Sequence, residues 1–433
     1  MIGPDGPAET GRNLAQERAV LLTLAAVQFT SIVDFMVIMP LGPQLMRTMG
    51  ISPAQFGLVV SSYTLSAGVA GVVASSLVDR FGRKSAFLTL YVGFLVGTLL
   101  CGLAPTYSTL LAARLVTGAF GGVLGGLAMT IIGDVFPDER RGRATGFLMS
   151  AFSLASIVGV PFGLYLGNLL GWHAPFLMLV ALGLPILGVG AWALPPLRGH
   201  LGRQVEVDDT WARLRETYTH PNHLRCFALI VSVMFGTFLV VPFLSPYFVS
   251  NVGVAEADLP WIYVAGGALS LVSSPLVGRW ADRSGKLKVY RVIAPASAAI
   301  MLLLTNLPRV PLAVAVGLVG LLMMSNAGRM VAAMAMVNNG VEPRLRGGFM
   351  SAYSSVQHVA SGLGSFVAGL ILVKSADGTL ARFGLVGLIG AGSTLFSLWL
   401  AGRLRPASSG KLNPEGTGSL AELIDVVPAA EAF

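Results

Sequence analysis

Twelve long apolar segments constrain the fold of this chain more than any other feature of its sequence. A helix that crosses a bilayer needs about 20 consecutive, mostly apolar residues. Six such segments fall in the first half of the chain, at 19–45, 54–77, 85–104, 107–132, 144–169 and 173–194. Six more fall in the second half, at 224–250, 258–278, 288–307, 311–336, 347–373 and 381–402. We therefore expect an all-α membrane protein whose 12 transmembrane helices form two pseudo-symmetric six-helix bundles.

The scarcity of charged residues also indicates a lipid environment. Only 12% of the 433 residues are charged, whereas soluble domains carry about 25%. A chain of this length could not cover a water-facing surface with so few charges. The expected organisation is a cytoplasmic N-terminal tail at 1–18, bundles at 19–194 and 224–402, a cytoplasmic linker at 195–223 and a cytoplasmic C-terminal tail at 403–433.

The basic residues lie mostly on one side of the predicted membrane. Of the 29 Lys and Arg residues, 23 fall in the termini and the even-numbered loops, four fall in the odd-numbered loops, and Arg114 and Arg329 lie inside helices. The positive-inside rule then predicts that both termini are cytoplasmic. This distribution also accounts for the net charge of +8. We therefore expect the lipid bilayer, and no nucleic acid, as the partner of the basic residues.

Two short motifs recur at nearly the same offset in the two halves. The loop after the second segment reads DRFGRK at 79–84, and the loop after the eighth reads DRSGK at 282–286, 203 residues later. An Arg-Gly pair at 141–142 recurs at 346–347, 205 residues later. Two motifs at equivalent places in each half indicate an internal repeat. Parallel six-helix repeats with a central site between them are a known plan of membrane transporters.

These loops resemble the signature loop of the major facilitator superfamily, and the resemblance covers about residues 19–402. Within that superfamily the chain is most similar to the twelve-helix drug:proton antiporter group, near the bacterial sugar- and arabinose-efflux-like permeases. The similar stretches are DFMVIMPL at 34–41, PYFVSNVG at 246–253 and GVPFG at 159–163, where a valine separates the Gly and Pro that adjoin in the antiporter motif. The resemblance implies a multi-pass, monomeric transporter of the bacterial inner (plasma) membrane, with a small-molecule substrate and protons as partners.

Asp34 and Arg114 are charged residues inside predicted membrane helices. A carboxylate at this depth costs roughly 3 kcal/mol on insertion scales, which makes a functional role the default hypothesis. At the helical rise per residue, Asp34 lies roughly 15 Å and Arg114 about 10 Å below the outer ends of their helices, so the two could pair. The resemblance implies that they serve proton coupling. The alternative is a static ion pair that holds two helices together.

Polar residues on several helices predict a substrate cavity. Thr30, Ser31 and Asp34 share one face of the first helix, and a row of serines accompanies His358 in the eleventh. The candidate cavity residues are Thr30, Ser31, Tyr247, Asn326, Arg329, Gln357 and His358. The serines could instead bond to carbonyls of their own helix, and Arg329 could extend to the lipid headgroups. His358 could relay protons, because imidazole titrates near neutral pH.

The DRxG loops predict a gating latch. The candidate latch residues are Asp79, Arg80, Gly82, Arg83, Asp134, Asp282, Arg283 and Gly285. In the superfamily this loop holds one half against the other when the cavity opens outward. By the repeat, Asp79 would meet the helix that starts near Gly347, and Asp282 would meet the helix that starts near Gly142. The positive N-terminal end of each helix would favour the carboxylate.

The same loops admit a simpler interpretation. Their basic residues could act only as a topology signal that keeps the loops inside. Gly82 and Gly285 favour the latch, because glycine suits a tight turn. Arg83 could then bond Asp134 at the end of the fourth helix.

Motifs of several other protein classes are absent from the sequence. Neither Gly285-Lys286 nor Gly410-Lys411 belongs to a Walker A motif, and the sequence has no H-E-x-x-H and no G-x-S-x-G. We therefore expect no enzyme activity and no cofactor. Cys101 and Cys226 are predicted toward opposite ends of the membrane, so we expect no disulfide and no metal site.

The preferred interpretation is proton-coupled efflux, or antiport, of a small organic compound such as a drug, sugar or metabolite. A sugar-like solute facilitator or importer without proton antiport is the first alternative, and a functional Asp34 would separate the two. The alternative from another class is a non-transporting membrane sensor. Cytoplasmic partners without substrate flux would mark it.

Overall fold

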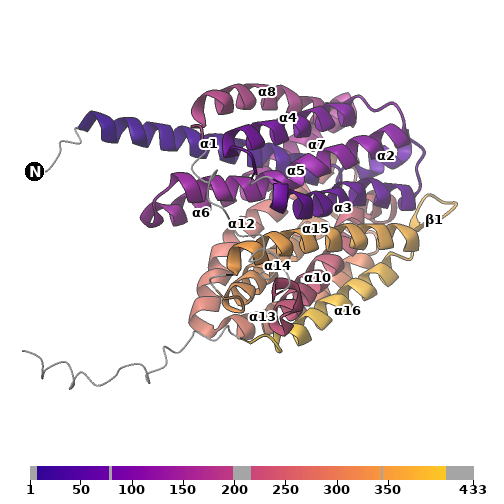
Figure 1. The fold of residues 1–433 in the computed structure, drawn as a ribbon. Coiled ribbons are helices and arrows are strands. Elements are labelled where there is room, and N and C mark those ends of the chain that lie inside the picture. Colours follow the sequence, from indigo (N-terminus) through magenta and orange to yellow (C-terminus); the bar gives the residue numbers. More distant parts are fainter. Residues whose placement is uncertain (1–6, 78–79, 198–215, 343–344, 406–433) are drawn as a thin grey trace, which may run out of the picture.

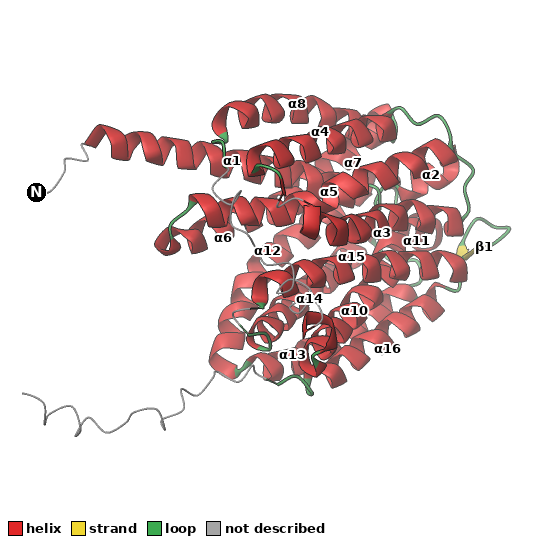
Figure 2. Cartoon of the chain, viewed as in Figure 1, coloured by secondary structure: helices red, strands yellow, loops and turns green. Residues whose placement is uncertain are grey.

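The protein is almost entirely helical, and its helices form two groups that lie side by side (Figure 1). The computed structural model describes residues 7–77, 80–197, 216–342 and 345–405. Most helices run from one end of the molecule to the other (Figure 2). We call the end that carries α2 (Gly42–Thr48) and the hairpin of β1 (Val373–Lys374) and β2 (Leu380–Ala381) the outer face. The inner face is the opposite end, where α1 (Pro7–Val37) begins.

The N-terminal half contains six membrane-length helical segments. The first is α1, which the short helix α2 follows. The next three are α3 (Pro53–Leu77), α4 (Arg83–Gly102) and α5 (Tyr107–Val135). The fifth joins α6 (Asp138–Leu154), η2 (Ala155–Gly159) and α7 (Val160–Leu170), and the sixth is α8 (Ala174–Ala193). The joining segment η2 is a π-helical turn. Pro161 follows it and has no N–H to donate to the preceding turn. The wider π turn accommodates that missing bond.

The C-terminal half repeats this order. Its segments are α10 (Pro221–Val240) with η3 (Val241–Phe243), α11 (Leu244–Tyr247) and η4 (Phe248–Val252), then η5 (Glu256–Asp258) with α12 (Leu259–Ser284), α13 (Lys286–Thr305), α14 (Leu312–Asn339), α15 (Arg346–Ile371) and α16 (Phe383–Ala401). The helical membrane fold predicted from the sequence is therefore confirmed. Each of the twelve predicted segments corresponds to a helical segment of the structure.

The helix α15 differs from the other segments in its polarity. Within the described residues, eleven helical segments are long and apolar enough to cross a membrane, and α15 is not among them. It has 26 residues, which is enough length, but its serines, Gln357 and His358 lower its hydropathy. It packs between α3 and α10. Its neighbours, rather than its own composition, therefore supply its apolar environment.

The first helix is shorter at its outer end than the predicted segment 19–45. It ends at Val37, a turn covers 38–41, and the short helix α2 follows. Pro40 explains the break, because proline cannot donate the backbone bond that a continuous helix needs there. At its inner end α1 extends back to Pro7, beyond the membrane-length part at Ala15–Val37.

The two halves pack on each other along two helix pairs. The helix α3 packs along α15, and α12 packs against η2 and α7. Glycine permits the first contact near the outer face. A Cβ added at Gly57 would lie 2.8 Å from the Ser365 carbonyl oxygen, and one at Gly369 would lie 2.9 Å from that of Pro53. The close contact continues toward the inner face, where a Cβ added at Gly71 would lie 2.6 Å from the Ser355 Oγ atom.

The repeat is visible in the ends of equivalent helices. The helix α1 ends at Val37 and α10 ends at Val240, 203 residues later. The two DRxG loops have the same offset. Applied to the last turns of these helices, it makes Thr237 the counterpart of Asp34, and Phe238 the counterpart of Phe35.

Candidate functional site

A fully buried ion pair lies in the N-terminal half, toward the outer ends of α1 and α4. The Arg114 Nη1 atom of α5 donates to the Asp34 Oδ2 atom of α1 over 2.7 Å, and both side chains are 0% exposed. The hydroxyl of Thr98 in α4 donates to Asp34 Oδ1 over 3.1 Å. Three helices thus converge on one carboxylate. The predicted pair is present in the structure, and Thr98 is a partner that the sequence did not reveal.

The arginine of this pair has unused hydrogen-bonding capacity. Its Nε and Nη2 atoms have no partner among the described residues, and its guanidinium lies 4.5 Å from the ring centroid of Tyr63 in α3. A ring face attracts a cation but accepts no strong hydrogen bond. The Asp34 carboxylate is therefore the main group that balances the positive charge of Arg114. Protonation of Asp34 would remove that balance.

Aromatic rings from both halves meet beside this ion pair. Phe35 lies next to Asp34 in the chain, and its ring centroid lies 5.3 Å from that of Tyr63 and 5.9 Å from that of Phe238 in α10. Phe35 and Phe238 are counterparts in the repeat. Both are half-buried. The rings mark the place where the two halves meet in the middle of the protein.

A second buried arginine lies in the C-terminal half. Arg329 of α14 is 0% exposed. Its Nη1 atom donates to Thr394 Oγ1 of α16 over 2.8 Å, and its Nη2 atom donates to Thr237 Oγ1 over 3.1 Å and to Asn326 Oδ1. It therefore points into its own bundle and does not extend to the lipid headgroups. Asn326, another candidate cavity residue, lies in the same cluster.

The other candidate cavity residues are more scattered. Thr30 is buried and shares a hydrogen bond of 3.2 Å with Tyr91 of α4, inside the N-terminal bundle. Ser31 is also buried. Tyr247 lies toward the outer face, where its hydroxyl donates to the Leu307 carbonyl over 3.0 Å. The structure does not bring these three together.

Gln357 and His358 stay on the polar helix α15. Both side chains are half-buried. The imidazole of His358 forms no hydrogen bond within the part of the chain that the structure describes, and Ser361 donates to the backbone carbonyl of Gln357. The serines of this helix bond mostly to its own carbonyls, for example Ser365 to Ser361 over 3.1 Å.

The latch residues occupy the inner face. Asp79 lies outside the described residues, and Arg80 is exposed. The Nε atom of Arg83 lies 3.4 Å from Asp134 Oδ2 at the end of α5. Asp282 and Arg283 are exposed, and neither forms a hydrogen bond or ion pair with a described residue of the other half. The predicted meeting of Asp282 with the helix near Gly142 is therefore absent from this arrangement.

The two latch glycines have different backbones. Gly285 has φ +94, a conformation that favours glycine, at the junction of α12 and α13. Gly82 has φ −59, which any residue can adopt. The tight-turn argument therefore holds for the second loop and not for the first.

An ion pair between the halves lies at the outer face. Arg47 of α2 donates to both carboxylate oxygens of Glu256 in η5, with Nη2 3.0 Å from Oε2. The hydrogen bond with Glu256 raises the pKa of Arg47 above its ordinary value. Asn168 of α7 donates to the Glu256 backbone carbonyl over 3.0 Å. This face is therefore held closed by polar contacts as well as by packing.

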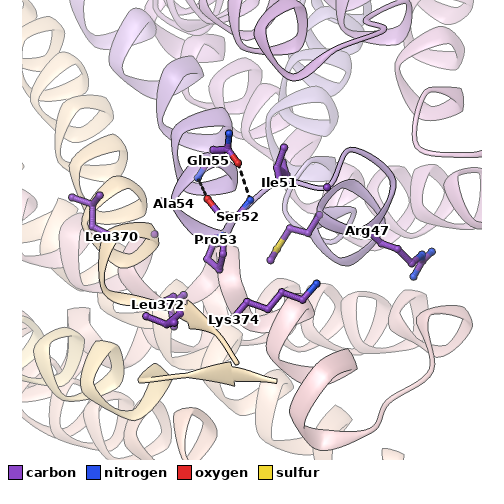
Figure 3. Close-up of a pocket in the computed structure, with 13 residues that line it drawn as sticks. Arg47, Ile51, Ser52, Pro53, Ala54, Gln55, Leu370, Leu372 and Lys374 are labelled. Atoms are coloured by element: carbon purple, nitrogen blue, oxygen red, sulfur yellow. Dashed lines mark hydrogen bonds between the residues drawn. The ribbon is translucent and has the colours of Figure 1, made fainter. Parts of the chain in front are cut away.

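A hollow of about 570 Å³ lies beside this ion pair (Figure 3). Its walls come from the start of α3, at Ser52 to Gln55, and from the end of α15 with β1, where Lys374 extends into it. It is thus lined by both halves. Within the described residues, no group of three or more His, Cys, Asp or Glu could hold a metal ion.

Comparison with known proteins identifies the family. The family model described as Major Facilitator Superfamily matches the chain twice, at residues 24–238 and 226–428. The inner membrane transport protein YdhP of Escherichia coli (strain K12) is 26% identical over 380 residues, which cover 85% of this chain and 92% of that protein. Multidrug resistance protein 3 of Bacillus subtilis (strain 168) is 36% identical over 129 residues, which cover 30% of this chain and 25% of that protein.

Some relatives match over a smaller share of their length. The MFS-type transporter YtbD of Bacillus subtilis is 25% identical over 264 residues, which cover 61% of this chain and only 65% of YtbD. Two solved structures are similar in fold. The crystal structure of a D-xylose-proton symporter has a TM-score of 0.74 at 16% identity, covering 91% of this chain and 99% of that one. A bacterial homolog of the lysosomal transporter Spinster has a TM-score of 0.68 at 17% identity, with 89% and 95% covered. The chain belongs to the Major Facilitator Superfamily.

Proposed function

We propose that the protein exports a small organic compound in exchange for protons. The observation that carries this proposal is the fully buried pair of Asp34 and Arg114. Ionisable residues at membrane depth commonly form proton relays in transporters. Protonation of Asp34 would release Arg114, whose Nε and Nη2 atoms have no partner in the part of the chain that the structure describes. The similarity to Multidrug resistance protein 3 is in keeping with efflux.

The proposed cycle alternates access to a site between the halves. Arg47 and Asn168 of the N-terminal half bond to Glu256 at the outer face, whereas Asp282 and Arg283 at the inner face bond to no described residue of the other half. We therefore assign this arrangement to the state that opens at the inner face. We propose that the inner face is cytoplasmic and that both termini lie there. In the opposite state a proton from outside would reach Asp34 and weaken its hold on Arg114 or on the substrate. Return to the first state would release the proton to the cytoplasm.

The DRxG loops are proposed to hold the inner face shut in the opposite state. In the arrangement described, Asp282 and Arg283 are exposed. An open latch leaves such residues exposed, and closure would bring Asp282 to the positive start of α6. The contact of Arg83 with Asp134 would fix the first loop on its own half throughout the cycle.

A flux assay on the purified protein in liposomes tests the proposal. A pH-sensitive dye is enclosed, and drugs, sugars and amphipathic metabolites are added one at a time. We expect at least one compound to move protons in wild type, and Asp34→Asn to abolish that movement. Asp377→Asn is the matched control, because it makes the same change at an exposed residue of the outer hairpin.

Two outcomes would contradict antiport. Compound movement without proton movement, unchanged in Asp34→Asn, would leave a facilitator or importer in which Asp34 is a structural charge. The absence of flux for every compound, together with recovery of cytoplasmic binding partners, would favour a sensor.

A further inference from the structure

Arg329 is a buried cation whose surroundings contain no compensating negative charge. Its side chain is 0% exposed, its donors reach only neutral oxygens of Thr394, Thr237 and Asn326, and its Nε atom has no partner. Across the described residues, no Asp or Glu forms an ion pair with it. Arg114, the buried arginine of the other half, has Asp34. Within the described residues, the C-terminal half therefore holds a buried positive charge that no carboxylate pairs with.

The chemistry of this cluster suits an anionic group. A buried charge is strongly disfavoured unless it is paired. Neutral hydroxyl and amide oxygens satisfy hydrogen bonds but leave the charge itself unbalanced. The planar fork of a guanidinium matches a carboxylate or sulfonate, which accepts two parallel hydrogen bonds. An incoming anion would replace weak acceptors by a full negative charge.

Part of the cluster is accessible. Arg329 and Thr394 are fully buried, but Thr237 and Asn326 are half-buried. These two share the Nη2 atom of Arg329. A ligand that arrives at this edge would meet Thr237 and Asn326 first and then the guanidinium.

The residues next to the cluster suit an apolar body. Phe238 follows Thr237 in α10, and its ring lies 5.9 Å from Phe35, which lies 5.3 Å from Tyr63. These rings come from both halves and lie where the halves meet. Thr237 and Phe238 are consecutive in α10, so the cluster and the rings lie within one turn of the same helix, although the two side chains leave that helix in different directions. Aromatic and aliphatic bodies gain most from such a surface.

We propose that Arg329, with Thr237 and Asn326, binds the anionic group of the substrate, and that the substrate is an organic carboxylate or sulfonate with an aromatic or apolar body. This inference rests on the proposed transport function and adds the substrate class to it. The two halves then divide the work. Asp34 binds the proton in the N-terminal half, and Arg329 binds the anion in the C-terminal half. Exit of an anion and entry of a proton are both favoured by an inside-negative membrane potential.

A binding measurement tests this inference independently of proton flux. The full-length protein in detergent is titrated at constant ionic strength with benzoate and with naphthalene-2-sulfonate, and the thermal unfolding midpoint and calorimetric Kd are recorded. Benzamide and naphthalene-2-sulfonamide are the neutral probes of matched shape. We expect at least one anion to bind wild type ten or more times tighter than its neutral counterpart.

Two variants and one control test whether anion binding depends on Arg329. Arg329→Gln removes the charge, and Thr237→Asp supplies a carboxylate from within the protein. We expect each to weaken anion binding at least tenfold and to leave the neutral probes unchanged. Arg309→Gln is the matched control at an exposed loop residue and should bind like wild type. Thr237→Asp keeps the arginine and gives it a partner, so it tests the proposal even if Arg329→Gln is unstable.

Other results would overturn the inference. They are equal affinity for anions and neutral probes, anion binding that survives in Thr237→Asp, or no binding of either anion to wild type. The proposed function fails in a different way. If anion binding depends on Arg329 but Asp34→Asn leaves proton movement unchanged, the anion site stands and antiport does not.

Discussion

The two halves of the molecule hold the same residue type in contrasting surroundings. Arg114 in α5 and Arg329 in α14 are both fully buried, and each donates to the last turn of the first helix of its own half. In the N-terminal half that turn offers the carboxylate of Asp34. In the C-terminal half the counterpart is Thr237. One repeat therefore carries a balanced pair, and the other carries an unbalanced cation.

This difference indicates how a repeated fold can serve two tasks. A pair of opposite charges changes state when its carboxylate takes up a proton, so it responds to pH. A lone guanidinium stays charged at every physiological pH and so responds to an anion instead. Positions 34 and 237 are counterparts in the repeat, whereas Arg114 and Arg329, 215 residues apart, are not. In the proposed function, the carboxylate at position 34 makes the first site respond to protons, and the neutral side chain at position 237 leaves the second site to an anion. The two sites meet through the rings of Phe35 and Phe238.

Substitution of the two arginines should give the largest difference in stability between the halves. Arg114→Met leaves the Asp34 carboxylate buried without its partner, and loss of one member of a buried pair costs about 3–5 kcal/mol. Arg329→Met leaves no charge behind, so we expect a change in unfolding free energy of less than about 1 kcal/mol, of either sign. Denaturant unfolding of the purified variants measures both.

The matched control is the double variant Asp34→Asn with Arg114→Met, which removes both charges. It should recover part of the stability that Arg114→Met loses, because no buried charge remains. If Arg329→Met proves as destabilising as Arg114→Met, the C-terminal arginine has a strong structural role, and the contrast between the halves is lost.

Much of this fold can be predicted from the sequence, because the length and polarity of a helix are local properties. The twelve segments, their grouping and the repeat all follow from apolar runs and short motifs. The outer end of α1 was missed because Pro40 was counted within an otherwise apolar run. Strand pairing in the hairpin at Val373–Lys374 was missed because two residues carry too little pattern to predict a strand.

The candidate site was only partly predictable. Asp34 and Arg114 stand out because charge is rare in membrane helices. Thr98 does not, since a threonine in an apolar helix usually bonds to its own backbone and only tertiary packing brings it to Asp34. The surroundings of Arg329 were equally hidden. The 203-residue offset between the two DRxG loops identifies Thr237 as the counterpart of Asp34.

Two threonines, one beside each buried charge, should give the next largest difference in stability. Thr394→Val removes the oxygen that accepts from Arg329 Nη1. Because Arg329 bonds only to neutral groups among the described residues, we expect the unfolding free energy to fall by about 1.5–3 kcal/mol. Thr98→Val takes a donor from Asp34, but the carboxylate keeps its ion pair, so we expect only about 1 kcal/mol. Thermal unfolding compares the two isosteric changes. A larger loss for Thr98→Val would show that the carboxylate depends on its neutral donor more than its ion pair suggests.

The paired phenylalanines give a smaller effect. Phe35 contacts two rings and Phe238 contacts only Phe35 among the ring pairs of the described residues. Aromatic pairs contribute about 0.5–1.5 kcal/mol each beyond their buried area. We expect Phe35→Leu to lower the unfolding free energy by more than Phe238→Leu, and both to weaken binding of naphthalene-2-sulfonate. Equal losses of stability would mean that the contact with Tyr63 contributes little. Unchanged sulfonate binding would place the apolar body elsewhere.

The smallest effect should come from the ion pair that joins the halves at the outer face. The proposed cycle requires the halves to move relative to each other, and in it the contact of Arg47 with Glu256 would have to break. The side chain of Arg47 is 61% exposed, so solvent screens the pair. An exposed pair contributes about 0.2–1 kcal/mol, which corresponds to a shift of roughly 1.4- to 5-fold in the equilibrium between closed and open outer faces.

Spin labels on either side of this contact measure that shift. Thr48→Cys and Ala257→Cys place labels at exposed positions of the two halves, in a background with Cys101→Ser and Cys226→Ser. We expect Arg47→Gln to raise the population of long distances, and high salt to do the same in the unsubstituted background, because both weaken the same attraction. Arg309→Gln, an exposed cation at the same face, should change nothing. If Arg47→Gln also leaves the distances unchanged, helix packing and the Asn168 contact with the Glu256 carbonyl hold the outer face closed without the ion pair. The substrate and proton would then have to open that packing without help from a charge switch.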